Sequence, residues 1–186
     1  ALILHEKFIK GRHLFHAIFY FPNIITPITL GVMFALMFDW QTGSVNKLLL
    51  ALGLAEEPIY WFNDVWLSRI IVAGVMMFQN FGINMLVFLA GLQAIPHDLY
   101  EAAEIDGASA IQKFFRITFP LLSPSVFFVL IITSINSFQL FPQVMIMTQG
   151  GPFGSTEVFM ERIYSYAFKY YEMGYASAYS WILFVF

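Results

Sequence analysis

Acidic and small side chains gather in one short segment, Glu101 to Pro120, which begins Glu-Ala-Ala-Glu-Ile-Asp-Gly. The carboxylates of Glu101 and Glu104 can pair with basic side chains of a second protein, because a charge-assisted contact is stronger than a neutral one. The alanines between them, Ala102 and Ala103, present a small surface that another backbone can approach closely. The chemistry that these residues suggest is therefore docking.

The other polar motifs give no sign of catalysis or metal binding. The glycine-rich run Gly150 to Thr156 has no lysine that would reach a phosphate, so we interpret it as a turn. The four histidines show no metal-ligand spacing with acids, and the chain has no cysteine. No nucleophile is paired with a base. We therefore expect no metal site, no cofactor and no enzymatic activity.

The composition places the docking segment in a membrane protein. Of 186 residues, 59% are hydrophobic and only 11% are charged, whereas a soluble domain carries about a quarter charged residues. Charged residues are absent from three long runs, Phe15 to Phe38, Ile70 to Leu92 and Leu121 to Thr148. Each run is long enough to cross a bilayer as a helix. We expect an all-α, polytopic membrane helical bundle, and the net charge of -3 does not suggest a nucleic-acid partner.

Two longer loops separate these expected spans. Asp39 to Leu67 carries four acidic residues against one lysine, Lys47. Within this loop, Asn46 to Leu54 is expected to form a short amphipathic helix on the membrane surface. Trp61 and Trp66 are expected to anchor this loop at the interface. Gly150 to Glu172 forms the other loop, which opens with a glycine turn and continues with a belt of tyrosines.

Both ends of the chain look incomplete. His5 to His13 is basic and is interpreted as a short loop at a membrane face. Met173 to Phe186 is apolar but shorter than the roughly 20 residues that cross hydrocarbon, and no polar residue closes it. We expect the chain to be a fragment of a longer membrane protein.

The docking segment has the local signals of two helices joined by a turn. Asp98 complements the positive end of a first helix dipole, and Gly107 can end that helix with a positive φ angle. Asp106 or Ser109 then caps a second helix, which Pro120 is expected to stop at the membrane. The apolar face of this second helix is formed by residues at helical spacing: Ile111, Phe114 and Phe115.

This pattern resembles the "EAA" signature of the permease subunits of binding-protein-dependent ABC importers. The matching positions are Glu101, Ala102, Ala103, Gly107, Ile117 and Pro120. Phe119 departs from the usual Leu but keeps an apolar residue. The resemblance implies that residues 93–120 form the cytoplasmic loop that docks into the ATPase, with Glu101 facing a basic residue, Gly107 forming the turn and Asp106 nearby.

Other stretches resemble the carbohydrate branch of these permeases. They are Leu89 to Pro96, Met147 to Pro152 with Thr156, Gly174 to Ala178, and Asn46-Lys-Leu-Leu. The resemblance implies the type I permease fold, with residues 1–186 as a single transmembrane domain in the inner membrane. It further implies a heterodimer with a second permease, two copies of a cytoplasmic ATPase, an external solute-binding protein, and import of a sugar or oligosaccharide.

Amides within the expected spans are the candidates for the solute pathway. Asn80 and Asn84 share one helix face, as do Asn136 and Gln139. Uncharged amides suit sugar hydroxyls, but helix-to-helix hydrogen bonding explains them equally well.

Several alternatives stay open at this point. The same fold could import glycerol phosphate or an amino acid. A small integral-membrane enzyme would need a His or acid pair at membrane depth, and only His16 comes near. A purely structural membrane subunit is the third possibility. In the importer interpretation, the amino end and the docking segment share one membrane face, and residues 39–67 and 150–172 lie on the other.

Overall fold

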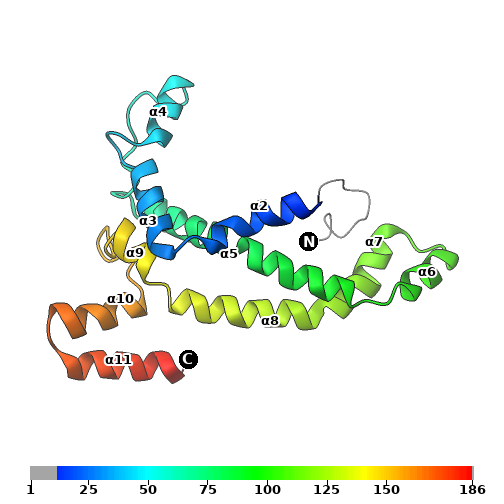
Figure 1. Cartoon of the computed structure of the whole chain (residues 1–186). Helices are drawn as coiled ribbons and strands as arrows, with labels where there is room; N and C mark the ends of the chain where they lie inside the picture. Colours follow the sequence, from blue (N-terminus) through cyan, green and yellow to red (C-terminus); the bar gives the residue numbers. More distant parts are fainter. Residues whose placement is uncertain (1–11, 186) are drawn as a thin grey trace. The chain divides into compact units, whose positions relative to one another are not determined.

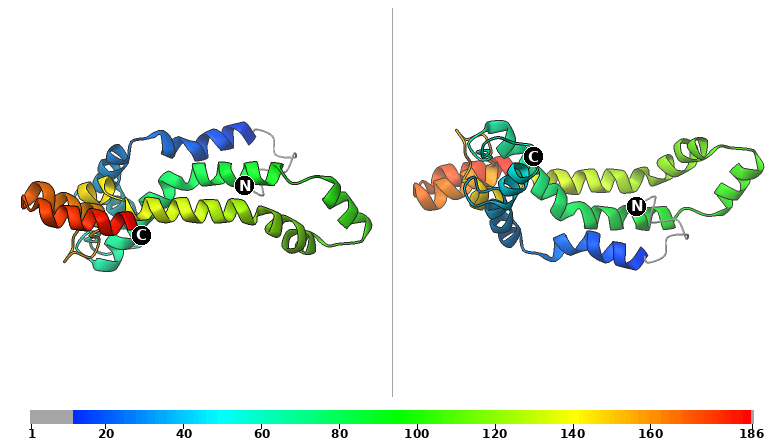
Figure 2. Two further views of the ribbon diagram at one scale, coloured as in Figure 1. Left: turned by 90° about the horizontal axis from the view of Figure 1, so that it is seen from below. Right: turned by 90° about the horizontal axis from the view of Figure 1, so that it is seen from above.

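The computed structural model describes residues 12–185, with side chains from Leu14 onward, and Figure 1 and Figure 2 show that every element in this range is helical. The all-α expectation is therefore confirmed. The helices are α2 (Arg12–Ile24), α3 (Pro27–Met37), α4 (Ser44–Ala51), α5 (Val65–Gln93), α6 (Asp98–Ile105), α7 (Ala110–Lys113), α8 (Phe119–Phe138), α9 (Pro142–Met147), α10 (Phe159–Tyr164) and α11 (Met173–Val185). Two π-helical turns, Phe114–Thr118 and Ser165–Lys169, follow α7 and α10. The loop predicted at His5 to His13 lies outside the described residues as far as position 11.

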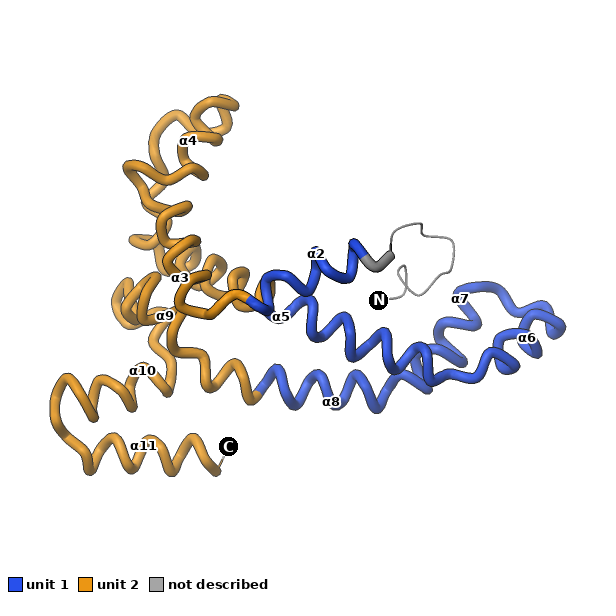
Figure 3. Tube along the Cα trace, viewed as in Figure 1, with its two compact units in different colours: residues 1–24, 80–134 blue, residues 25–79, 135–186 orange. Residues whose placement is uncertain are grey.

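The chain divides into two compact units (Figure 3). Unit 1 comprises residues 1–24 and 80–134, and unit 2 comprises residues 25–79 and 135–186. Helices α5 and α8 are each divided between the two units. Each unit is described separately below, and the expectation of a single domain stays a prediction.

Two helices are long and apolar enough to cross a membrane. One is α5, which confirms the span expected at Ile70 to Leu92. The other is the continuous helix Ala110–Phe138, formed by α7, the first π-helical turn and α8. The span expected at Phe15 to Phe38 is instead two helices, which count as a third span only if taken together. The interruption has a local cause, because Thr26 caps α3 by accepting a hydrogen bond from the Thr29 N–H at 3.2 Å, and the ring of Pro27 opens that helix.

The predicted end of the third span was wrong. Helix α8 ends at Phe138 rather than continuing to Thr148, and α9 begins anew at Pro142. The preceding residue, Phe141, has φ −136°, outside the helical region. This follows from the proline ring, which pushes the residue before it out of the α conformation.

Close backbone approach holds unit 1 together. A Cβ at Gly82 of α5 would lie only 2.6 Å from the Cα of Tyr20 in α2, so only glycine fits there. Beside it, the rings of Phe19 and Phe81 meet at 5.3 Å. In Figure 2 the parts of α5 and α8 that belong to this unit run side by side. The absent side chain of Gly91 makes room there for Leu122 of α8.

The core of unit 2 is a small buried cluster of Leu30, Ile71, Val75 and Met147. It draws α3, α5 and α9 together, and aromatic side chains such as Phe34 and Phe38 pack around it. A Cβ at Gly31 of α3 would touch α9 at ordinary contact distance, 3.5 Å from the Cα of Gln143. An alanine at this position would therefore also fit between α3 and α9.

The expected surface helix at Asn46 to Leu54 is shorter and better anchored than predicted. Helix α4 ends at Ala51, and Asn46 is 3% exposed. The Asn46 amide donates to the carbonyls of Trp40 (3.1 Å) and Ile59 (2.9 Å), and its oxygen accepts from the indole N–H of Trp61 at 2.9 Å. Trp61 is thus held inside unit 2 rather than anchoring the loop at the interface, whereas Trp66 is 69% exposed.

The expected loop Gly150 to Glu172 contains a helical stretch, Phe159 to Lys169. Its glycine turn is confirmed, because Gly150 has φ +81°. From Phe159, however, α10 and the second π-helical turn form a continuous helical stretch to Lys169. Figure 1 shows this stretch running beside α11, both within unit 2.

Candidate functional site

The docking segment forms the two helices that its sequence predicts. Helix α6 carries Asp98 and Glu101 in its first turn, where both complement the helix dipole. Gly107 follows with φ +73°, the left-handed conformation expected of it. Ser109 caps α7 through a capping box, in which the Ser109 N–H donates to the Gln112 side chain at 2.8 Å. Asp106 instead ends α6.

Two side-chain contacts fix α6 against the helix that follows. The Lys113 ammonium lies 2.7 Å from the Glu104 carboxylate, and this hydrogen bond lowers the pKa of Glu104 below its ordinary value. The Tyr100 hydroxyl lies 2.8 Å from the hydroxyl of Thr118, which is 5% exposed. With one contact close to the turn and one farther from it, the two helices are positioned as a single rigid element.

One surface of this element is acidic and apolar together. The Glu101 side chain is 66% exposed and lies 3.1 Å from His97 Nδ1. Ile105, one helical turn after Glu101 on α6, is 87% exposed, Ile111 on α7 is 71% exposed, and α6 has no buried residue of its own. Exposed apolar side chains around an exposed acid are typical of a protein interaction surface. Ala102 is also exposed and Ala103 is half-buried.

Pro120 does not stop the second helix, contrary to the sequence prediction. The helix passes through it and continues to Phe138. The preceding π-helical turn allows this. The Phe119 N–H donates to the Phe114 carbonyl in an i→i−5 pattern, so the helical hydrogen bonds are already displaced by one residue at Pro120, which has no N–H to donate. Ile117 lies in that turn and is half-buried.

The predicted pathway amides fall in both units. Asn80 and Asn84 are half-buried on the unit 1 part of α5. Asn136 and Gln139 are exposed in unit 2, at the end of α8. Their assignment to one solute pathway stays a prediction.

A different pair of span amides connects helices. The Gln143 side chain of α9 donates to the Gln79 oxygen of α5 at 2.7 Å, and the Gln79 nitrogen donates to the Ile25 carbonyl at 3.2 Å. Both glutamines are buried, at 5% and 7% exposed. For these two residues, helix-to-helix hydrogen bonding is the observed role.

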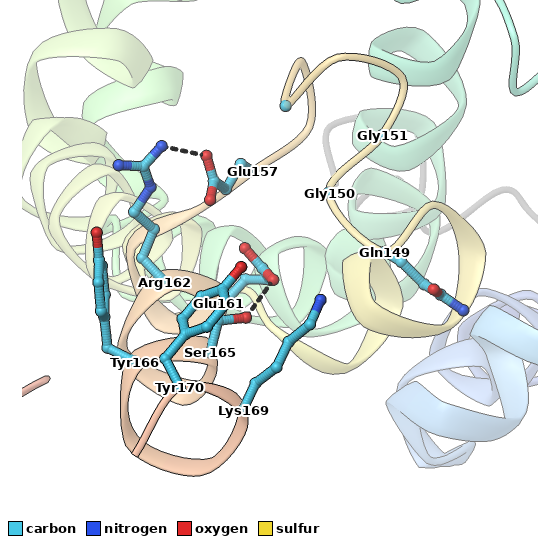
Figure 4. Close-up of a pocket in the computed structure, with 11 residues that line it drawn as sticks. Gln149, Gly150, Gly151, Glu157, Glu161, Arg162, Ser165, Tyr166, Lys169 and Tyr170 are labelled. Carbon is cyan, nitrogen blue, oxygen red and sulfur yellow. Dashed lines mark hydrogen bonds and ion pairs between the residues drawn. The ribbon is translucent and has the colours of Figure 1, made fainter. Parts of the chain in front are cut away.

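A pocket of 360 Å³ lies in unit 2 between the glycine turn and the helical stretch that follows it (Figure 4). The sequence reasoning missed it. It is lined by Gln149, Gly150, Gly151, Gly154, Glu157, Glu161, Arg162, Ser165, Tyr166, Lys169 and Tyr170. The signal in the sequence was the four-residue spacing of Glu161, Ser165 and Lys169, which is typical of one helix face.

Charge pairing organises this pocket. The Arg162 guanidinium donates to the Glu157 carboxylate at 2.5 Å. This hydrogen bond lowers the pKa of Glu157 and raises the pKa of Arg162. The Ser165 hydroxyl donates to Glu161 at 2.9 Å, and Glu161 is only 8% exposed. Glu157 and Arg162 are therefore both charged at neutral pH, and the Ser165 hydroxyl holds the Glu161 side chain in place.

Comparison with known proteins shows the family of this chain. Residues 4–186 match the family described as "Binding-protein-dependent transport system inner membrane component". Over its whole length the chain is 36% identical to the probable ABC transporter permease protein YesP of Bacillus subtilis. It is 34% identical to the arabinooligosaccharides transport system permease protein AraP of the same organism, again over its whole length. The chain spans 60% of YesP and 59% of AraP.

A solved structure is similar in fold. It is the crystal structure of a bacterial ABC transporter involved in the import of the acidic polysaccharide alginate. The TM-score is 0.87 at 25% sequence identity, and the match covers 97% of this chain and 63% of that one.

Proposed function

Since the chain belongs to the family of binding-protein-dependent transport system inner membrane components, we propose that it forms part of the membrane permease of an ABC importer. The observation that carries the proposal is the docking segment, in which Glu101 is exposed on a rigid pair of helices between two apolar helices. An exposed acid on a rigid element suits a basic site on another subunit. In this role the segment 93–120 transmits ATPase movement to the membrane helices.

The solute is a sugar or oligosaccharide in this proposal. The relative AraP is named for arabinooligosaccharides, and the structural relative for alginate. The stretch from Ile70 to Leu92 and helix α8 contain no charged side chain, while amides such as Asn84 and Asn136 lie on them. Neutral amides pair with hydroxyl groups without the cost of burying a charge, which favours a solute rich in hydroxyl groups over an amino acid.

The partners follow from this role. The chain would pair with a second permease and dock onto two copies of a cytoplasmic ATPase, and an external solute-binding protein would deliver the sugar. ATP hydrolysis would belong to the ATPase, so this chain would act as a transport subunit and not as an enzyme. In the inner membrane, the amino end and residues 93–120 would face the cytoplasm, and residues 39–67 and 150–172 the outside.

Reconstitution tests the proposal. The full-length permease, its partner permease, the ATPase and the solute-binding protein are placed in proteoliposomes, and ATP-dependent uptake of labelled arabinotriose and maltotriose is measured. Uptake of either sugar that requires both ATP and this subunit supports the proposal. ATP-independent uptake, or uptake that persists without this subunit, contradicts it.

A further inference from the structure

The unit 2 pocket is used neither by the docking segment nor by the predicted pathway amides. It lies between the turn at Gln149 to Gly154 and the helical stretch that begins at Phe159. Its 360 Å³ falls within the range of about 300–1,000 Å³ that small-molecule pockets occupy. A ligand the size of one or two sugar rings fits such a volume.

The charges that line this pocket balance. By residue type the lining holds two acids, Glu157 and Glu161, and two bases, Arg162 and Lys169. A site for an anion or a cation would carry a surplus of the opposite sign. No group of three metal-ligating side chains occurs within the described residues. The balance of charges therefore favours a neutral ligand.

The lining offers both acceptors and donors. Ser165 satisfies one site on the Glu161 carboxylate, and an ionised carboxylate has about four acceptor sites. Arg162 likewise has more donors than its pair with Glu157 uses. A ligand whose groups both donate and accept hydrogen bonds can engage both kinds of side chain, and a sugar hydroxyl is such a group.

One tyrosine presents an aromatic surface beside these groups. The ring of Tyr166 is held between aromatic neighbours, at 5.4 Å from Tyr179 and 5.6 Å from Tyr175. The Tyr170 ring lies 5.8 Å from that of Tyr166 and 5.8 Å from the Lys169 ammonium, and 57% of this tyrosine stays exposed. The negative face of an aromatic ring attracts the weakly positive C–H groups of a sugar.

Glycine keeps the opposite wall open. Gly150 has φ +81°, and a Cβ there would point toward Glu161, 3.6 Å from its Oε2. Figure 4 shows the side chain of Gln149 directed away from the labelled charged residues. The turn therefore lines the pocket with backbone, and no side chain of residue 150 lies against the Glu161 carboxylate.

We propose that this pocket is a carbohydrate-binding site in the loop region, separate from the amides of the membrane helices. Glu161 and Arg162 hydrogen-bond the hydroxyls of one sugar unit, and the ring of Tyr170 packs against its C–H face. The inference rests on the proposed function only in that a sugar importer brings oligosaccharides to this surface.

Saturation-transfer difference NMR tests the site directly. The permease pair with its ATPase, without the solute-binding protein, is placed in nanodiscs and mixed separately with arabinotriose and maltotriose. We expect a transferred signal from at least one trisaccharide. Glu161→Gln and Tyr170→Ala should each reduce it at least fivefold. The Tyr170 change lies at an exposed position, so it tests the site even if the Glu161 variant folds poorly.

Two neighbouring residues outside the pocket provide matched controls. Glu172→Gln removes an exposed acid, and Tyr171→Ala removes a tyrosine that is 80% exposed. Alanine at position 171 leaves the backbone strain at φ +58° unchanged, because both residues carry a Cβ. Both controls should retain the full signal. Equal signals in all four variants, or no signal from either trisaccharide in the unaltered complex, overturn the proposal.

Two further measurements separate this site from the other roles. Glu101→Lys should abolish uptake but leave the NMR signal intact, so that a failure of the transport proposal is seen independently. If Tyr170→Ala instead weakens capture of the solute-binding protein and leaves the sugar signal unchanged, the pocket is a protein-docking surface and the carbohydrate assignment is wrong.

Discussion

The Lys113 ammonium and the Glu104 carboxylate meet at 2.7 Å across the turn that Gly107 makes. The pair joins α6 to the long helix Ala110–Phe138. The two acids are almost equally exposed, at 65% for Glu104 and 66% for Glu101, but Glu104 is held by an ammonium whereas Glu101 lies 3.1 Å from the exposed imidazole of His97. This geometry divides the two acids into one that positions the helices and one that is available for docking.

Breaking this pair should change the titration of Glu104. In the folded protein the hydrogen bond from Lys113 lowers the pKa of Glu104. The pair therefore stabilises the folded protein at pH values above the ordinary pKa of 4.5. This stabilisation is lost as the pH falls through the lower pKa of the folded state. Lys113→Met should raise the pKa of Glu104 toward 4.5, as measured by NMR titration of labelled glutamate. The control is Lys47→Met, which changes an exposed lysine distant in sequence from Glu104 and should leave the pKa of Glu104 unchanged.

Loss of the Gln79 amide should destabilise the permease. Gln79→Leu removes the acceptor for the buried Gln143 nitrogen and the donor to the Ile25 carbonyl. A buried polar group left without a partner costs about 1–3 kcal/mol. We expect a lower melting temperature in detergent and a lower membrane level. A variant as stable as the unaltered protein contradicts the packing role of this pair.

The exposed amides at the end of α8 should behave differently. Asn136→Leu and Gln139→Leu should leave the membrane level unchanged, because both side chains are exposed in unit 2. If they line the solute pathway, sugar uptake should fall while ATPase association persists. Normal uptake by both variants, and by Asn80→Leu and Asn84→Leu, would show that the amides have only a structural role.

Single cysteines test the membrane topology, since the native chain has none. Ile105 and Phe153 are the suitable positions, at 87% and 98% exposed, whereas the Ser155 hydroxyl is buried. An impermeant maleimide added to intact cells should label Phe153→Cys and not Ile105→Cys. The pattern should reverse in inside-out vesicles. Labelling of both from the same side refutes the topology.

The sequence predicted those features that depend on local signals. The absence of charge from Ile70 to Leu92 predicted α5, and the Gly107 turn with its Ser109 cap followed from residue type alone. The errors in the expected spans and in the end of the docking segment came from proline. Pro27 begins a new helix where a continuous span was expected, and Pro120 is tolerated because a π-helical turn precedes it.

Features that depend on contacts distant in sequence were beyond prediction. The pairing of Gln79 with Gln143 requires that α9 pack against α3 and α5, which no local pattern specifies. The burial of Asn46 by Trp40 and Ile59 is of the same kind. The unit 2 pocket was more accessible to prediction, because Glu157, Glu161 and their neighbours recur every four residues, but the tyrosines nearby favoured a membrane-interface interpretation.

Charge reversal at Glu101 tests the central claim most directly. Glu101→Lys should leave the membrane level of the permease unchanged, because the side chain is 66% exposed. Its matched control is Glu56→Lys, an exposed acid in the loop at residues 39–64. The measurement is co-purification of the ATPase together with ATP-dependent sugar uptake. We predict a loss of about tenfold or more in both for Glu101→Lys alone, since removing one partner of an interfacial charge pair is strongly unfavourable. Normal ATPase co-purification and uptake in that variant would contradict the docking role of this segment.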